Sequence, residues 1–133
     1  MRPVVRLKTD RLIIRPFREH DLDEFRKLLD IPEAPGWQRE KGRAADFLHE
    51  IFYSLLPGVR GKGYAKEAAK AVTEWALGTY HIPYIIATVE VDTIASQKVV
   101  ESCGYTFIDQ RALMVHILGE RRVFRYYRRY ASI

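Results

Sequence analysis

Two glycines and two cations share one turn of this sequence, Arg60-Gly61-Lys62-Gly63, directly before an alanine-rich segment with helical spacing. Glycine lets a backbone approach a ligand closely, and a helix N-terminus directs N–H groups and positive dipole at an anion. The turn therefore predicts an anion site, although a plain strand-to-helix turn with solvated cations explains it equally well. Its spacing matches neither Gly-x-Gly-x-x-Gly nor Gly-x-x-x-x-Gly-Lys-Ser/Thr, which argues against dinucleotide and Walker-type sites.

Several other side chains could carry chemistry, and each has an ordinary structural explanation. Glu90 could serve as a general base, but an acid near a strand end is usually only solvated. Cys103 is the single cysteine, and free cysteines usually act as small buried apolar groups. The histidines show no metal-ligand spacing, so we expect no metal; they are His20, His49, His81 and His116.

The C-terminal segment 121–130 interleaves cations with aromatic side chains, a composition that can stack the bases of single-stranded nucleic acid. Strand alternation accounts for the same residues, because it divides them between two faces as in a half-buried strand. No nucleic-acid fold signature accompanies the segment, so we favour the strand over a nucleic-acid partner. One face would carry Phe124, Tyr126 and Tyr130, and the other Val123, Arg125, Tyr127 and Arg129.

The elements around the glycine turn predict a β-α-β unit. Residues 51–56 form a short apolar run that favours a buried strand, and 64–80 carry one apolar helical face. Residues 84–91 are rich in strand formers, so we expect this strand to run parallel to 51–56 after a right-handed crossover.

The remaining pattern adds helices and strands on both sides of this unit. Gly104 stands where a left-handed helix cap belongs, after a compact helix. The last two strands look like a hairpin. We predict helices over 21–30, 39–50 and 95–102, and strands over 12–16, 105–108, 112–118 and 122–130.

Composition and net charge limit the classes of protein to which this chain can belong. The 133 residues are 47% hydrophobic and 29% charged, which suits one globular domain over residues 1–133. The net charge of +5 suits an anionic ligand. A lone cysteine fits a reducing compartment, and no apolar run approaches the ~20 residues of a membrane span, so we expect a cytoplasmic protein with no membrane partner.

A longer frame around the turn carries a family resemblance. Arg60-Gly61-Lys62-Gly63-Tyr64-Ala65 fits Arg/Gln-x-x-Gly-x-Gly/Ala, the pyrophosphate-binding signature of the GNAT superfamily of acetyl-coenzyme A-dependent N-acetyltransferases. Segment 9–17 resembles the opening strand of the branch that includes the ribosomal-protein alanine acetyltransferases, and Asp21-Leu22 resembles its first helix. Residues 95–105 resemble its late helix and following strand. The resemblance covers about residues 8–108 and implies an α/β fold, a mixed twisted sheet with helices on both faces.

The resemblance also implies a reaction, transfer of acetyl from acetyl-coenzyme A to a primary amine of a protein N-terminus or a small molecule. Backbone N–H groups of the turn would hold the pyrophosphate, and the acetyl thioester would lie where strand 51–56 splays from strand 84–91. A backbone N–H of the first strand would stabilise the oxyanion. The cofactor-binding residues implied are Leu55, Leu56, Arg60, Gly61, Lys62, Gly63, Tyr64, Ala65, Thr93 and Ser96.

The late helix departs from the family pattern at two positions. The tyrosine that often protonates the leaving thiolate is replaced by Val100, and the asparagine that contacts the coenzyme arm is replaced by Thr93. The alternative proton donor of the alanine-acetyltransferase branch is a serine that matches Ser96, our catalytic candidate. Hydrogen bonding at the start of a helix explains Ser96 equally well.

The interval between the second helix and the strand before the loop is short. The family normally has two further strands there, whereas this chain has only residues 31–50 for the whole interval. Either the domain lacks two central strands, or residues near Glu50-Ile51 are missing from the sequence. A shortened sheet would expose an edge that a second copy can cover, so a homodimer is one expectation.

Two alternatives to a working acetyltransferase stay open. In one, an acetyl-coenzyme A-binding module retains the pocket after catalysis has decayed, as Val100, Thr93 and the short central interval suggest. In the other, a basic protein binds nucleic acid through its C-terminal arginines, and this binding would weaken steeply with salt.

Overall fold

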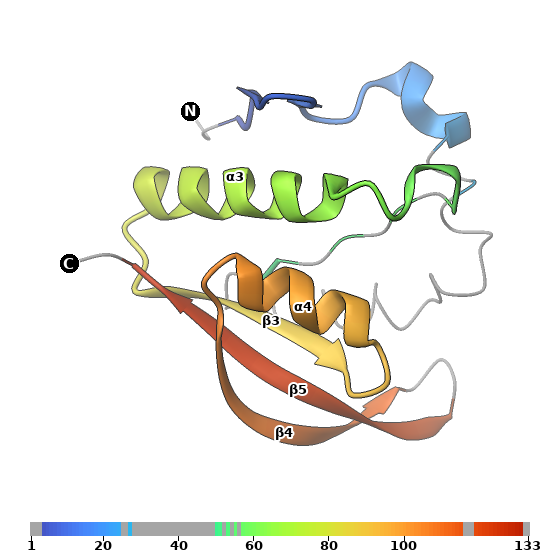
Figure 1. Ribbon diagram of the computed structural model, residues 1–133, viewed down its shortest axis with the longest axis vertical. Coiled ribbons are helices and arrows are strands. Elements are labelled where there is room, and N and C mark those ends of the chain that lie inside the picture. Colours follow the sequence, from blue (N-terminus) through green and yellow to red (C-terminus); the bar gives the residue numbers. More distant parts are fainter. Residues whose placement is uncertain are drawn as a thin grey trace.

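The computed structural model describes residues 4–24, 27, 50–51, 53, 55, 57–115 and 119–131. A three-stranded antiparallel sheet contains β3 (Tyr84–Glu90), β4 (Thr106–Val115) and β5 (Glu120–Tyr130). The order is β3-β5-β4, so the last strand lies between the other two (Figure 1). Its two neighbours satisfy the backbone of β5 on both edges, which stabilises its arginine- and tyrosine-rich sequence as a strand.

The observed bounds of β4 differ from the predicted ones. We expected separate strands over 105–108 and 112–118, but residues 106–115 form one continuous strand. Its register against β5 shifts between Phe107 and Asp109, as in a β-bulge, which lets a strand bend and resume pairing. The polar residues after Phe107 look like a loop in the sequence because their pairing with β5 is a long-range contact. The predicted hairpin is confirmed, since β4 and β5 pair antiparallel along their length.

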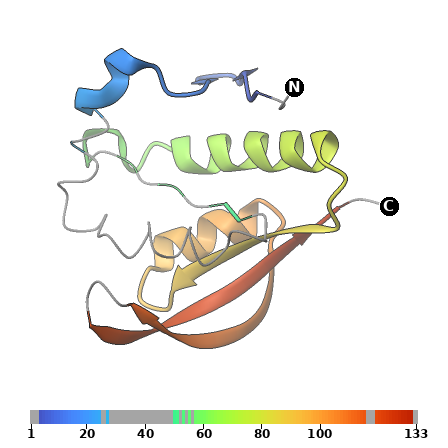
Figure 2. The ribbon, with the colours of Figure 1, turned by 180° about the vertical axis from the view of Figure 1, so that it is seen from behind.

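Both long helices cover one face of this sheet (Figures 1 and 2). Helix α3 spans Tyr64–Thr79 and α4 spans Ile94–Ser102, close to the predicted bounds. Gly104 adopts φ +87°, which confirms the left-handed residue expected after α4. Between the helices and the sheet lies a core of buried side chains: Ala69, Ile85, Ala87, Val89, Val100, Cys103, Tyr105 and Tyr127.

A buried hydrogen bond joins α3 to the chain between α4 and β4. The hydroxyl oxygens of Thr73 on α3 and Tyr105 lie 2.8 Å apart, and both residues are almost fully buried. Burial raises the pKa of Tyr105 to about 12, although the Thr73 hydroxyl partly opposes the rise. Ionising this phenol inside the core is therefore costly, and folding stability depends on its staying neutral.

This pKa predicts an alkaline loss of stability. An unfolded tyrosine ionises near pH ~10, so the contribution of Tyr105 is complete below that pH and falls as the pH rises towards about 12. Urea unfolding at several pH values should show this fall, and Tyr105→Phe should flatten it. An equal decline in the phenylalanine variant would assign the effect to other groups.

The segment before the glycine turn makes one parallel contact with the sheet. Glu50 forms an isolated parallel bridge with Ile86, and the Ile51 N–H donates to the Ile86 carbonyl at 2.9 Å. The crossover therefore returns parallel, as predicted. Described residues 51, 53 and 55 belong to no strand, so the prediction of a regular strand over 51–56 is wrong for them. Among the described residues, the bond from Ile51 is not followed by backbone hydrogen bonds from 53 and 55 to β3, which a strand requires.

The N-terminal segment forms a small hairpin on the far side of α3 from the sheet (Figure 1). Strands β1 (Leu7–Lys8) and β2 (Ile13–Ile14) pair antiparallel, which confirms a strand within 12–16 but shortens it. A 3-10 helix, η1 (Glu19–Asp21), follows, and the Arg15 guanidinium donates to Asp21 at 2.6 and 2.9 Å. This bond holds the pKa of Asp21 well below its usual range.

The two predicted helices of the middle region lie largely outside the described residues. Residues 22–24 are helical, as expected at the start of the helix over 21–30. Most of the predicted helix over 39–50, and most of the central interval, lie outside the described residues. Which face of the sheet those elements cover stays a prediction.

Candidate functional site

The glycine turn is a cradle that opens helix α3. A 3-10 turn, η2 (Pro57–Val59), leads into it, and Gly61 and Gly63 adopt φ +76° and +81°. Glycine adopts these positive φ angles without strain, so the backbone can turn at both positions just before the helix begins. Gly63 is the N-cap and makes no side-chain capping bond. The first N–H groups of α3 have no partner within the helix and can receive an anion.

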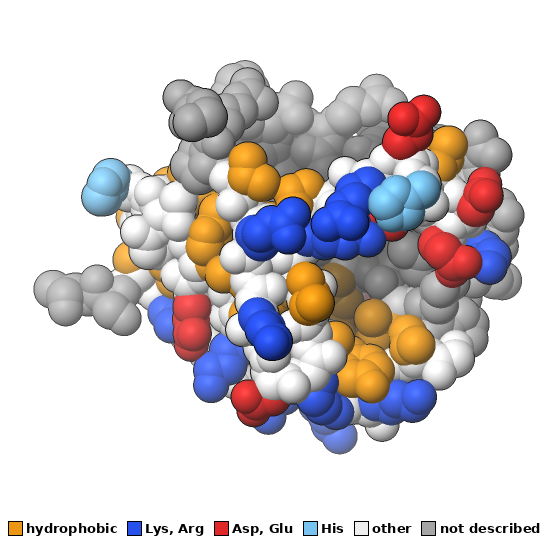
Figure 3. Space-filling view, turned by 90° about the horizontal axis from the view of Figure 1, so that it is seen from above, with side chains coloured by type: hydrophobic (Ala, Val, Ile, Leu, Met, Phe, Trp, Pro, Cys, Tyr) orange, Lys and Arg blue, Asp and Glu red, His pale blue; other side chains and the backbone are white. Residues whose placement is uncertain are grey.

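The cations of the turn differ in their surroundings. Arg60 is exposed and its Nε donates to the Leu55 carbonyl at 3.0 Å, which ties the turn to the chain before it. Lys62 is exposed, while its carbonyl accepts a hydrogen bond from Arg11 at 2.7 Å. Seen from above the N-terminal hairpin, Lys and Arg side chains lie across the middle of the face (Figure 3). Leu56 lies outside the described residues.

The late-helix candidates lie at the start of α4 and on its buried face. Ser96 lies in the first turn of α4 and is half-buried, and Thr93 is the exposed N-cap residue. Val100 is 2% exposed and belongs to the core, so its position offers no proton. The sequence analysis missed Tyr53, whose hydroxyl oxygen is buried and has no hydrogen bond of normal geometry among the described residues.

Tyr53 and Ser96 lie near each other although 43 positions separate them along the chain. Burial raises the pKa of the Tyr53 hydroxyl, and the nearby Ser96 side chain opposes that rise. Tyr53 comes two residues after Ile51, where the chain leaves its parallel contact with β3. Two hydroxyl groups from distant parts of the chain therefore lie close together. Local sequence patterns carry no signal for such a pair.

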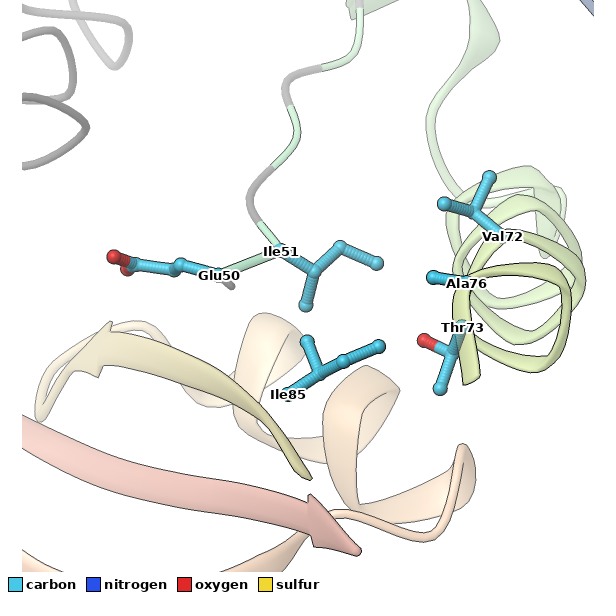
Figure 4. Close-up of a pocket in the computed structure, with 6 residues that line it drawn as sticks. All are labelled: Glu50, Ile51, Val72, Thr73, Ala76 and Ile85. Atoms are coloured by element: carbon cyan, nitrogen blue, oxygen red, sulfur yellow. The ribbon is translucent and has the colours of Figure 1, made fainter. Parts of the chain in front are cut away.

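A pocket of about 120 Å³ lies between residues 50–51, helix α3 and strand β3. Figure 4 shows its apolar side chains pointing toward one another, while the Glu50 carboxylate points away from them. That carboxylate accepts a hydrogen bond from the Thr88 hydroxyl at 2.9 Å. The pocket favours hydrocarbon over charged groups. Its described lining residues are Glu50, Ile51, Val72, Thr73, Ala76 and Ile85.

Glu90 and Cys103 both have structural partners. Glu90 accepts a hydrogen bond from Arg122 at 2.8 Å, an ion pair that opposes a role as a free general base. The Cys103 thiol is buried, and burial raises its pKa, which lowers its reactivity as a nucleophile. These contacts favour the structural explanation of each residue.

Arginines of the C-terminal segment stack on rings of the same sheet. The Arg125 guanidinium lies 4.0 Å from the centre of the Phe107 ring, and Arg128 lies 4.3 Å from that of Tyr84. Arg111 on β4 covers Tyr126 at 3.7 Å. Cation–π contacts of this kind stabilise the sheet. They favour the half-buried strand over a surface that stacks nucleic-acid bases.

The family model for the acetyltransferase (GNAT) domain matches residues 31–106, more than half of the chain. The chain belongs to the GNAT acetyltransferase family. The match includes the glycine turn and α4, so the resemblance predicted from the sequence is confirmed. It also includes residues 31–49, outside the described part of this GNAT chain.

Individual relatives match only part of the GNAT chain. An uncharacterized N-acetyltransferase of Bacillus subtilis, YnaD, is 36% identical over 56 residues, 42% of this chain and 33% of its own. A GNAT-family acetyltransferase structure from Bacillus anthracis has 26% identity and a TM-score of 0.56, covering 62% of this chain and 49% of its own. Ribosomal-protein-S5-alanine acetyltransferase from Vibrio fischeri has 19% identity and a TM-score of 0.57, covering 62% and 45%.

The GNAT chain therefore spans no more than about half the length of these relatives. The shared part contains the family fold, which confirms the predicted fold class. None of the helices among the described residues combines the length and the apolar composition that crossing a membrane requires.

Proposed function

We propose that this GNAT domain binds acetyl-coenzyme A and transfers its acetyl group to a primary amine. The observation that supports this most directly is the cradle at Gly61–Ala65, with two left-handed glycines at the start of a 16-residue helix. N–H groups there suit the pyrophosphate, a dianion, because the helix dipole and the loop peptides favour negative charge. Arg60 and Lys62 add positive charge beside it.

The gap beside β3 suits the reacting end of the coenzyme. The chain from Glu50 leaves β3 after one bridge, and the backbone of Leu55 and Leu56 would hydrogen-bond the pantetheine arm. Acetyl-coenzyme A supplies an activated acetyl thioester. The acceptor nitrogen would bond to the acetyl carbon while the carbon–sulfur bond breaks, and the proton that the amine loses balances the one that the thiolate gains.

Ser96 would pass a proton to the leaving sulfur, with the Tyr53 hydroxyl beside it and Thr93 near the coenzyme arm. The buried hydroxyl of Tyr53 has no hydrogen bond of normal geometry among the described residues, and this supports the assignment, because an unsatisfied buried oxygen is costly unless a partner completes its hydrogen bonding. The acceptor would be a protein N-terminal amine or a small-molecule amine. The lone buried Cys103 fits the reducing environment of the cytoplasm.

Release of coenzyme A thiol, measured with spermidine and with a peptide that begins with alanine, tests the proposal. Turnover with either acceptor supports an acetyltransferase. Tight binding of acetyl-coenzyme A without turnover would instead favour the alternative of a binding module with decayed catalysis, which the buried Val100 supports. Absence of binding would contradict both.

Ser96→Ala should lower kcat by roughly 10²-fold and leave the Kd for acetyl-coenzyme A within about twofold, because general acids contribute mainly in the transition state. Ser102→Ala on the same helix is a matched control, since the exposed Ser102 hydroxyl lies at the opposite end of α4 and donates to the Val99 carbonyl. Unchanged kcat with a lower Tm would assign Ser96 to helix stability.

A further inference from the structure

Arg11 connects the N-terminal hairpin to the glycine turn, although it comes 51 positions before Lys62. Its Nη1 donates to the Lys62 carbonyl at 2.7 Å. Its guanidinium lies 4.7 Å from the centre of the Tyr64 ring, and a Cβ added to Gly63 would meet its Nη2 at 3.1 Å. Arg11 thus contacts Lys62 and Tyr64 and lies close to Gly63 between them.

Glu67 on α3 anchors this arginine. Its carboxylate accepts hydrogen bonds from the Arg11 Nε at 2.7 Å and from the Arg11 backbone N–H at 2.9 Å, and also from the Thr9 hydroxyl. The Thr9 and Arg11 hydrogen bonds hold the pKa of Glu67 below its usual value. The carboxylate therefore stays ionised near neutral pH and keeps the guanidinium in one orientation.

The orientation of the Lys62 carbonyl determines where the next N–H points. In a trans peptide the C=O of one residue and the N–H of the following residue point in opposite directions. No cis peptide is present among the described residues. Since the Lys62 carbonyl points at Arg11, the Gly63 N–H points away from it, to the opposite side of the turn.

We propose that Arg11 is a positioning residue for the coenzyme: anchored by Glu67, it holds the Lys62–Gly63 peptide so that the Gly63 N–H faces the pyrophosphate. This inference rests on the proposed function. Arg11 acts through the backbone and lies on the carbonyl side of this peptide, opposite the Gly63 N–H, so it need not touch the ligand. Lysine cannot replace it, because one ammonium lacks the planar fork that reaches a carbonyl and a carboxylate together.

Two measurements on the whole chain test this role. Amide hydrogen exchange without ligand should become faster over residues 61–65 in Arg11→Gln. Calorimetry should show the Kd for coenzyme A rising roughly tenfold, the usual cost of losing a hydrogen bond to a charged group. Pantetheine, which lacks the pyrophosphate, should lose less than twofold. Arg11→Lys should behave like Arg11→Gln, and Glu67→Gln should reproduce both effects.

Arg15→Gln is the matched control, since it breaks the Arg15–Asp21 ion pair in the same N-terminal segment. It should leave exchange over 61–65 and the Kd unchanged. Equal weakening of coenzyme A and pantetheine, or normal exchange in Arg11→Gln, would overturn the proposal. A parent protein that binds no coenzyme A would contradict the proposed function, and the ordering of the turn by Arg11 would then be decided by exchange alone.

Discussion

Gly63→Asp should abolish measurable binding of acetyl-coenzyme A, with a rise in Kd of more than 10²-fold. Gly63 has φ +81°, an angle that strains side-chain-bearing residues, and the added Cβ would meet the Arg11 guanidinium at 3.1 Å. The carboxylate would also lie beside the Arg11 guanidinium and compete with the Lys62 carbonyl for it. Strain, crowding and this competition act in the same direction. Calorimetric titration of acetyl-coenzyme A into the two proteins measures the loss.

Gly58→Asp is the matched control for this experiment. Gly58 lies in the 3-10 turn just before the cradle and is not one of the described glycines with a positive φ. A Cβ added there would have no atom within 4 Å. The same charge should therefore cost much less there. Parent-like binding by Gly63→Asp would show that the pyrophosphate does not bind at this turn. Equal losses in both variants would implicate charge alone.

Tyr127→Ala should remove a large part of the folding stability. Tyr127 is 0% exposed in the middle of β5, and its ring lies 5.9 Å from that of Phe107. Its hydroxyl donates to the Glu101 carboxylate at 3.0 Å and accepts from Arg125 at 2.9 Å. Replacing a buried aromatic by alanine costs about 3–5 kcal/mol, against a total of about 5–15 kcal/mol for a small domain. Urea unfolding monitored by circular dichroism measures the difference.

Tyr130→Ala controls for the loss of an aromatic from the same strand. Tyr130 is 47% exposed and meets Tyr84 edge-on, so its removal should cost about 1 kcal/mol or less. Tyr127→Phe should separate the hydroxyl from the ring, with a cost of about 1 kcal/mol. Comparable losses for Tyr127→Ala and Tyr130→Ala would contradict the placement of the core on the α3 and α4 face.

Local sequence patterns were sufficient to predict the elements whose formation depends mainly on neighbouring residues. The alanine face of α3, the β-branched run of β3 and the left-handed Gly104 each depend on neighbours along the chain. The same holds for the cradle, because glycine at positions 61 and 63 is a local requirement of the backbone. These features were predicted with nearly their observed bounds.

Contacts between distant residues decided the rest. The sequence by itself determined the family, the glycine cradle and the helix that it opens, since each is encoded in a short run of residues. Only the tertiary structure placed Arg11 against the Lys62 carbonyl and the Tyr53 hydroxyl beside Ser96. It also joined residues 106–115 into one strand through pairing with β5. The physical reason is that such contacts depend on how the folded chain brings remote segments together, which spacing along the sequence does not record.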